Sequence, residues 1–203
     1  MKSYSQEQED IILHEILKDV NKGFYIDIGA NDPDVYSVTK LFYEEGWHGI
    51  NVEPLPEQFQ MLRQKRERDI NLNIAIGNRP GVMDLYIDGM GSTLSDTVVK
   101  DNHLEGKRTI FVKVWTLAEL IEKYGAEEIH FCKVDVEGFE KEVLEGMNWN
   151  RRPWVFCMES TKPGTHIPCY EEWEHILTGN GYELKKVHGI NRYYVDVRRE
   201  WHD

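Results

Sequence analysis

The sequence predicts one α/β domain built on a doubly wound, mostly parallel sheet. Short apolar segments typical of strands alternate with segments of helical periodicity along nearly the whole chain. Such alternation is typical of parallel sheets with right-handed crossovers. The last two strand segments, 182–188 and 192–197, are separated only by a short turn, which predicts an antiparallel hairpin at the end of the sheet. A chain of 203 residues is long enough to bury such a sheet in one core.

The first part of the chain begins with a helix that we expect to act as a lid or cap. Ser5 and Gln8 resemble a capping box, and Ile12, Leu13 and Ile16 share a helical stripe that ends before Gly23. The predicted elements are, in order, a helix over 5–21, a strand from 24, a helix over 37–45, a strand ending at 52, a helix up to 66 and a strand over 72–76.

The second part continues the alternation after a turn at 78–81. Residues 88–108 show neither helical nor strand periodicity, and we expect a functional or mobile loop there. The remaining elements are strands over 82–87, 109–114, 129–134 and 154–158, helices over 117–124 and 170–179, a short helix around 143–144, and the hairpin. No linker or repeat interrupts residues 1–203, which predicts a single domain.

Composition excludes several classes of protein. The net charge of −12 disfavours general affinity for nucleic acid, which depends on neutralising phosphates. The apolar runs are far shorter than the ~20 residues that span a bilayer. We find no secretion signal at the N-terminus, and the three cysteines, Cys132, Cys157 and Cys169, lack metal-type spacing. A reducing, cytoplasmic location fits these features best.

A polar turn follows the first predicted strand. The apolar run 24–26 leads into Asp27, Gly29 and Asn31, and the second predicted strand ends on another carboxylate, Glu53. In a Rossmann-like βαβ unit, the glycine lets backbone approach a nucleoside-like ligand, and the second acid accepts the ribose hydroxyls. Taken alone, the first motif also fits a tight turn in which Asp27 caps backbone amides. Together with Glu53, it predicts a cofactor site.

The kind of cofactor follows from what stands after Gly29. A dinucleotide site requires G-x-G-x-x-G, whereas this chain has Ala30, Asn31, Asp32, Pro33 and Asp34. Acids in that turn would repel a pyrophosphate, but they suit a cofactor with sulfonium and ammonium groups. S-adenosylmethionine carries both groups and also a ribose. We therefore expect S-adenosylmethionine rather than a dinucleotide.

Further acids follow the two strands expected near the end of the sheet. Asp135 and Glu137 come after the strand over 129–134, and Glu159 comes after the next one. We expect Asp135 to act in the site and Glu137 to cap the following helix. Glu159 either joins Asp135 in the site or anchors the loop after it. Two such carboxylates bind Mg²⁺, or one serves as general base for a hydroxyl. His166, in the loop beyond, is a second candidate base or a surface residue.

The order of these motifs resembles the FkbM-type family of S-adenosylmethionine-dependent methyltransferases. The resemblance covers nearly the whole chain and rests on matching segments at 5–10, 25–31, 46–54, 73–77, 92–94, 133–140 and 191–195. It implies the class I methyltransferase fold, a seven-stranded sheet that ends in an antiparallel hairpin. Dehydrogenases, by contrast, tend to finish with another βαβ unit. The resemblance also implies methyl transfer to a hydroxyl of a sugar, nucleotide-sugar or glycan.

The family pattern gives roles to individual residues. It implies that Asp27, Gly29, Ala30 and Asn31 line the methionine end of the cofactor, and that Glu53 holds the ribose. Other implied contacts are Pro54, Ala75 and Ile76 at the adenine, Asp135 near the sulfonium and acceptor, and Gln6 closing the site. A divalent cation such as Mg²⁺ at Asp135 and Glu159 is a further expectation, although Ser160 stands where a third acid is usual. Homo-oligomers or association with glycosyltransferases are expected partners.

Two other functions are compatible with the fold alone. One is a nicotinamide-dependent sugar oxidoreductase or epimerase, which the absent G-x-G-x-x-G and absent Tyr-x-x-x-Lys helix disfavour. The other is a catalytically silent module that binds the cofactor, which the acids at three strand ends disfavour. The acceptor hydroxyl is not encoded in any motif, since loops such as 88–108 and 161–169 would select it.

Overall fold

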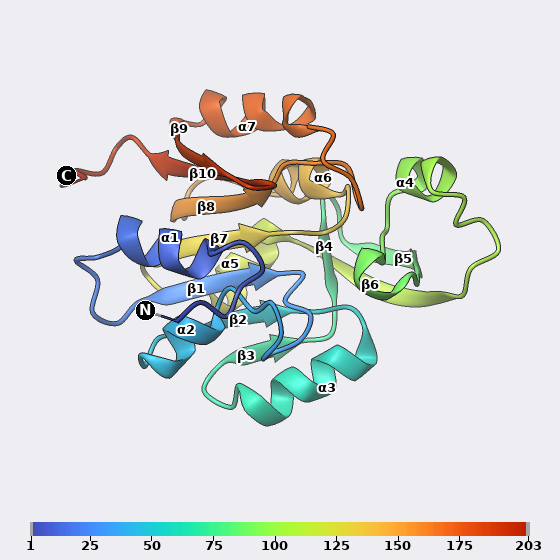
Figure 1. Cartoon of the computed structure of the whole chain (residues 1–203), viewed down its shortest axis with the longest axis horizontal. Helices are drawn as coiled ribbons and strands as arrows, with labels where there is room; N and C mark the ends of the chain where they lie inside the picture. The colour runs from blue at the N-terminus through green and yellow to red at the C-terminus, as the bar shows by residue number, and fades with distance from the viewer. Residues whose placement is uncertain (1, 202–203) are drawn as a thin grey trace.

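A seven-stranded sheet organises the computed structural model, which describes residues 2–201 (Figure 1). Its strand order is β3-β2-β1-β7-β8-β10-β9, and only β10 runs antiparallel to its neighbours. The strands are β1 (Phe24–Ile28), β2 (His48–Val52), β3 (Ile70–Leu72), β7 (Ile129–Val134), β8 (Pro153–Glu159), β9 (Tyr182–His188) and β10 (Asn191–Asp196). The predicted doubly wound sheet with a terminal hairpin is confirmed.

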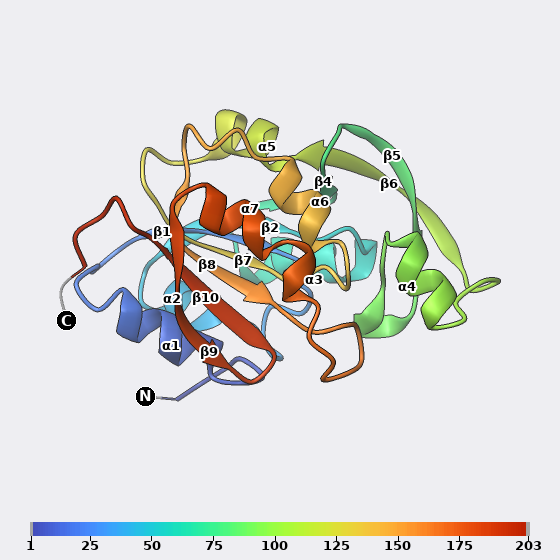
Figure 2. The same ribbon diagram turned by 90° about the horizontal axis from the view of Figure 1, so that it is seen from above.

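Helices cover both faces of this sheet, which is why its central strands read as continuous apolar runs. Tyr25 and Phe131 belong to the core under α1 and α2, whereas Ile26, Cys132 and Phe156 belong to the core under α5, α6 and α7. Figure 2 shows α1 and α2 on the opposite side of the sheet from α5 and α6. The helices are α1 (Glu9–Ile16), α2 (Lys40–Glu44), α3 (Pro56–Lys65), α5 (Leu117–Tyr124), α6 (Glu140–Glu145) and α7 (Glu174–Gly179).

A second sheet of three strands, in the order β4-β6-β5, extends beyond the carboxyl ends of β1, β2 and β7 (Figures 1 and 2). It consists of β4 (Ala75–Gly77), β5 (Gly81–Tyr86) and β6 (Thr109–Thr116). The single strand expected over 72–76 is therefore wrong, because the segment divides between two sheets. Asn73 marks the division, since its side-chain amide donates to the backbone carbonyls of Glu53 and Pro54, both at 2.9 Å.

The expected loop over 88–108 contains a helix of its own. After a 3-10 turn at Gly89–Gly91, α4 spans Asp96–Asp101. Ser95 caps α4 by accepting a hydrogen bond from the backbone N–H of Val98. Only Val98 and Val99 are buried in this helix. Two adjacent apolar residues give no helical period, so the sequence pattern does not indicate α4.

The N-terminal helix is also shorter than the expected 5–21. Gln8 precedes α1 in the left-handed region at φ 64°, and no capping box forms at Ser5. Instead, the Asp10 carboxylate accepts hydrogen bonds from the Ser3 and Ser5 hydroxyls and the Tyr4 backbone N–H, which folds residues 3–8 against the start of the helix. Within the described chain, no helix combines the length and hydropathy needed to cross a bilayer.

Two further helices are trimmed in the same way. The helix expected over 37–45 is reduced to α2, which starts at Lys40. The helix expected over 170–179 divides into a 3-10 turn, Tyr170–Glu172, and α7. Helix ends are the least regular part of a helix, and in these two segments most of the difference lies at the N-terminal end.

Candidate active site

A cavity of about 450 Å³ lies between the carboxyl ends of the parallel strands and the second sheet. Its volume is within the range usual for small-molecule sites. The cavity is lined by every residue expected to bind the cofactor or take part in catalysis: Gln6, Asp27, Gly29, Ala30, Asn31, Glu53, Pro54, Ala75, Ile76, Asp135, Glu159 and His166. The fold thus brings segments from both ends of the chain to one place.

The turn after β1 requires glycine at position 29. Gly29 has φ +79°, and a Cβ atom there would lie 1.9 Å from the backbone oxygen of Asp135. The backbone N–H groups of Gly29 and Ala30 both donate to the carbonyl of Val52 at 3.1 Å. The turn is therefore fixed between β2 and the end of β7, where Gly29 and Ala30 line the cavity.

Glu53 joins the ends of β1 and β2. Its carboxylate accepts hydrogen bonds from the backbone N–H groups of Asn31 at 2.8 Å and Leu55 at 2.7 Å. Only 4% of Glu53 is exposed, and burial raises the pKa of its carboxyl group to about 7. Each carboxylate oxygen keeps a second lone pair, so the side chain can still accept hydroxyl donors from a ligand in the cavity.

Lys133 supplies a buried positive charge behind the site. Its ammonium donates to the carbonyl of Gly29 at 2.6 Å and lies 3.4 Å from Asp27 and 3.3 Å from Asp135. Burial disfavours the ammonium, but the carboxylates of Asp135 and Asp27 outweigh burial and raise the pKa of Lys133. Its role was not predicted, although a lysine inside an apolar strand was a usable signal. The Oδ1 atom of Asp27 has no hydrogen-bond partner among residues 2–201.

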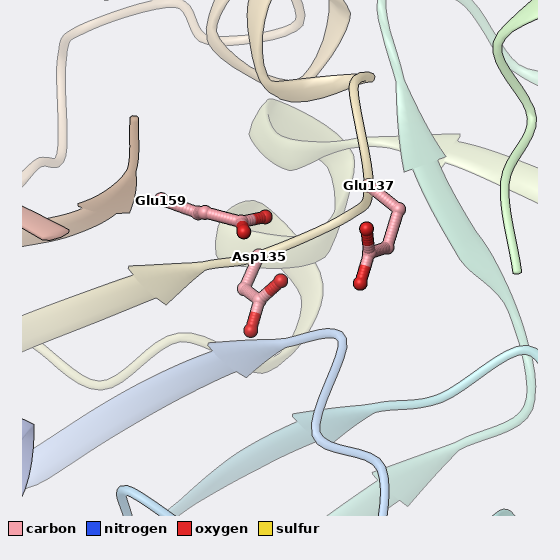
Figure 3. Close-up of side chains that lie close together, drawn as sticks. All are labelled: Asp135, Glu137 and Glu159. Atoms are coloured by element: carbon pink, nitrogen blue, oxygen red, sulfur yellow. The ribbon is translucent and has the colours of Figure 1, made fainter. Parts of the chain in front are cut away.

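Three carboxylates converge where β7 and β8 end (Figure 3). One oxygen each from Asp135, Glu137 and Glu159 lies within 4.8 Å of the other two. Burial, followed by the neighbouring charge of Asp135, raises the pKa of Glu137 to about 8 and also raises the pKa of Glu159. Close carboxylates cannot all ionise without a compensating cation, so this corner of the cavity favours positively charged ligands.

The expectation that Glu137 caps the following helix is wrong. The N-cap position of α6 is Phe139, which makes no side-chain cap. Glu140, the first residue of α6, instead fixes the turn before the helix, because its carboxylate accepts hydrogen bonds from the backbone N–H groups of Val136 at 3.1 Å and Gly138 at 3.2 Å. Glu137 itself adopts φ 55°, and its carbonyl accepts a hydrogen bond from the Thr93 hydroxyl at 2.7 Å. The sequence could not separate the two acids, because both lie within reach of the same turn.

The loop after β8 is anchored by Ser160 rather than by Glu159. Both the backbone N–H and the hydroxyl of Ser160 donate to the carbonyl of Ile190, at 2.8 and 2.6 Å. The second oxygen of Glu159, Oε2, has no hydrogen-bond partner in the described part of the chain. His166 is exposed on the same loop, at the rim of the cavity.

The N-terminal segment adds two acids that were not predicted. Glu7 accepts a hydrogen bond from the backbone N–H of Ile190 at 2.8 Å, and Glu9 accepts one from the side chain of Asn191 at 2.9 Å. Both acids line the cavity beside Gln6. Their contacts join the two ends of the chain, so no local pattern in the sequence could have indicated them.

The model of the methyltransferase FkbM domain matches residues 27–184, which is well over half of the chain. No curated protein matches the chain significantly. Among solved structures, the chain is similar to a methyltransferase FkbM from Methylobacillus flagellatus KT, with a TM-score of 0.56 and 14% identity. The match covers 86% of this chain and 44% of that one. A METTL16 methyltransferase domain matches with a TM-score of 0.46 and 13% identity, over 92% of this chain and 64% of that one.

The structural similarities concern the fold, and this chain spans under half of the length of the first match. The family match is of a different kind, because it runs from Asp27 in the first motif to the hairpin and includes Glu53, Asp135 and Glu159. The sequence-based expectations of family and fold are thereby confirmed. The chain belongs to the methyltransferase FkbM family.

Proposed function

We propose that this methyltransferase transfers the methyl group of S-adenosylmethionine to a hydroxyl of a sugar, nucleotide-sugar or glycan. The observation that supports the proposal is the composition of a single cavity, which joins the turn at Gly29 and Glu53 to the acids at Asp135 and Glu159. The first part suits a nucleoside with a cationic side chain, and the second suits a polar acceptor. The family supports S-adenosylmethionine as the cofactor.

The residues of the cavity fit this cofactor. The Oδ1 atom of Asp27 accepts no hydrogen bond from residues 2–201 and lies 3.4 Å from the Lys133 ammonium, so it offers a buried acceptor for a second ammonium group. Glu53 accepts hydroxyl groups of a ribose. Apolar side chains of Pro54, Ala75 and Ile76 provide a surface for the adenine. Gln6 reaches the cavity from the N-terminal segment and closes it from that side.

The bound cofactor supplies a methyl group already activated by its sulfonium. The chain's contribution is therefore to align the acceptor hydroxyl with that methyl group, to exclude water and to remove one proton. Asp135 is the best-placed base, because 40% of its side chain is exposed, whereas Glu159 is buried. Glu159 keeps its proton more readily, and His166 at the rim is the alternative base. A divalent cation at Asp135 and Glu159 belongs to the same proposal.

The family match affects the two alternative functions differently. The oxidoreductase reading is no longer needed, since the chain belongs to a methyltransferase family. A silent cofactor-binding module is the outcome that an assay must exclude. Because the chain spans 44% of the solved FkbM methyltransferase, self-association and partnership with glycosyltransferases are also proposals about the whole protein.

The test is transfer of an isotope-labelled methyl group from S-adenosylmethionine across a panel of sugars and nucleotide-sugars, with Mg²⁺ or with EDTA. Calorimetric titration with S-adenosylhomocysteine measures cofactor binding separately. We expect binding and transfer by the native chain and by Glu122→Gln, an exposed acid on α5. Cofactor binding without transfer to any acceptor would support the silent module, and absence of binding would overturn the proposal.

A further inference from the structure

We propose that Asp135, Glu137 and Glu159 together form a divalent-cation site, with Glu137 as a third ligand supplied by the loop after β7. The site adjoins the methyl-transfer cavity, so its place in catalysis rests on the proposed function, whereas cation binding itself does not. Three carboxylates replace the pair that the sequence indicated. Glu137, from the loop after β7, thus supplies the third acid in place of the one that is absent at Ser160.

The spacing of the oxygens suits one ion. Ligands held at about 2.1–2.5 Å from a hard cation lie at most about 4–5 Å from each other. The three carboxylate oxygens already lie within 4.8 Å of one another. Mg²⁺, Mn²⁺ and Ca²⁺ prefer such oxygen ligands, so little rearrangement would be needed for one ion to contact all three.

Glu159 gives an independent indication of a ligand. Only 6% of this residue is exposed, and its Oε2 atom lacks a hydrogen-bond partner within residues 2–201. A buried carboxylate oxygen without a partner is costly, and native structures pair such atoms with donors or cations. Asp135 and Glu137 place two further carboxylates beside it.

Charge balance favours a divalent cation over a second ammonium group. The cluster and Asp27 carry four carboxylates, and Lys133 is the cation that contacts Asp27 and Asp135. A divalent ion with Lys133 leaves one negative charge, which the single net positive charge of S-adenosylmethionine compensates. An organic ammonium in place of the ion would leave a further negative charge in a largely buried space.

The backbone around Glu137 holds its side chain toward the cluster. A non-glycine residue at φ 55° is uncommon, and here it is followed by Gly138 at φ +88°. Thr93 fixes the Glu137 carbonyl from the second sheet's side, while Glu140 fixes the amides on either side of Glu137. A cation bound here would also lower the pKa of an acceptor hydroxyl that contacts it.

The whole chain is first dialysed against EDTA and then titrated with Mn²⁺, and electron paramagnetic resonance measures the bound ion. This experiment tests the site without any methyl acceptor. We expect one Mn²⁺ per chain, displaced by Mg²⁺. Glu137→Gln and Glu159→Gln should each weaken Mn²⁺ binding by roughly tenfold or more, since loss of even an outer partner of a metal site costs 10–100-fold. Glu122→Gln, the same change on exposed α5, should leave Mn²⁺ binding unaltered.

Thermal unfolding, measured with and without Mn²⁺, distinguishes a variant that does not bind the ion from a variant that does not fold. In EDTA, Glu159→Gln should unfold at or above the temperature of the native chain, because it replaces a buried carboxyl group whose ionisation the neighbouring carboxylates oppose. Added Mn²⁺ should then raise the unfolding temperature of the native chain and of Glu122→Gln, but not of Glu137→Gln or Glu159→Gln.

Absence of Mn²⁺ binding by the native chain, or unchanged binding in Glu137→Gln, would overturn the site. Stabilisation by methylammonium, with none by Mn²⁺, would instead assign the cluster to an organic cation. Titration with S-adenosylhomocysteine in EDTA separates this result from the proposed function. A chain that binds the cofactor but not Mn²⁺ loses only the metal site, and a chain that binds Mn²⁺ but not the cofactor loses only the methyl-transfer proposal.

Discussion

The ammonium of Lys133 lies 3.4 Å from the carboxylate of Asp27, and both side chains are almost fully buried. This pair connects β7 to β1 beneath the turn at Gly29. It provides positive charge at a cavity whose other charged lining residues, His166 aside, are acids. The pair therefore allows the acids of the predicted site to be placed so close together.

Replacement of Lys133 by methionine should strongly destabilise the chain. The change leaves Asp27 buried without its cation, and breaking a buried ion pair in this way costs about 3–5 kcal/mol. Urea unfolding monitored by circular dichroism measures the loss. Lys113→Met, on the exposed side of β6, is the matched control and should stay within about 0.5 kcal/mol of the native chain. Equal stability of the two variants would show that Lys133 is not needed to hold the site.

Gly29→Ala should disrupt the turn after β1. The new methyl group would meet the backbone oxygen of Asp135, and alanine disfavours φ +79°. We expect a loss of stability above about 2 kcal/mol and a loss of S-adenosylhomocysteine binding by calorimetry. Gly179→Ala, where no atom lies within 4 Å of the new methyl group, should be neutral or slightly stabilising. Unaltered cofactor affinity in Gly29→Ala would contradict the assigned role of this turn.

Glu53 should make stability depend on pH. Burial raises its pKa to about 7 from the usual 4.5, so the folded chain keeps a proton that the unfolded chain has lost. The free energy of unfolding should therefore fall as pH rises from about 4.5 to 7, and then level off. Glu53→Gln removes this contribution, so it should match the native chain at pH 5 and exceed it by up to about 3 kcal/mol at pH 8. The free energy of unfolding of both proteins is measured by urea unfolding at each pH. The same pH dependence in the two proteins would rule out this role of Glu53.

Glu140 should act as a positioning residue for Glu137. Glu140→Ala leaves the backbone N–H groups of Val136 and Gly138 without their acceptor, at a cost of about 1–3 kcal/mol in stability. The turn that holds Glu137 should loosen, and Mn²⁺ affinity should fall by roughly tenfold. Glu140→Gln retains an acceptor oxygen and should restore most of the Mn²⁺ affinity. A variant that loses stability but keeps full Mn²⁺ affinity would assign Glu140 a purely structural role.

Substitutions of Asp135 and of His166 should have different effects on the rate of methyl transfer. If Asp135 removes the acceptor proton, Asp135→Asn should lower kcat by about 10²–10⁴-fold, the usual contribution of a general base. His166→Ala, at the exposed rim, should change kcat by less than about tenfold and act mainly on KM. Steady-state kinetics with the best acceptor from the panel decide between the two. The reverse order of effects would move the base to His166.

The parallel core could be predicted because its information is local. Each buried strand is a continuous apolar run, and Asp27, Glu53, Asp135 and Glu159 stand where such a run ends. The carboxyl ends of parallel strands meet at one edge, so residues far apart in the sequence could be placed in one site.

The parts that escaped prediction depend on tertiary contacts. The bend at Asn73 is fixed by carbonyls of another loop, and α4 buries too few residues to show a helical period. Which of Glu137 and Glu140 fixes the turn before α6, and which faces the cavity, depends on a left-handed residue that no pattern of residue types specifies. Glu7 reaches the cavity only because the two ends of the chain meet.

The three-stranded second sheet has a consequence for how such an enzyme can diversify. In the chain, the second sheet lies between β3 of the main sheet and helix α5. Residues 88–108, which we call the arm, connect two strands of this second sheet and contribute no strand to the seven-stranded sheet. Recombination or engineering can exchange this arm without altering strand pairing around the cofactor end of the cavity. If this arm selects the acceptor, acceptor preference can evolve as a separate module. The hydrogen bond from the Thr93 hydroxyl to the Glu137 carbonyl is one link that a new arm would have to preserve.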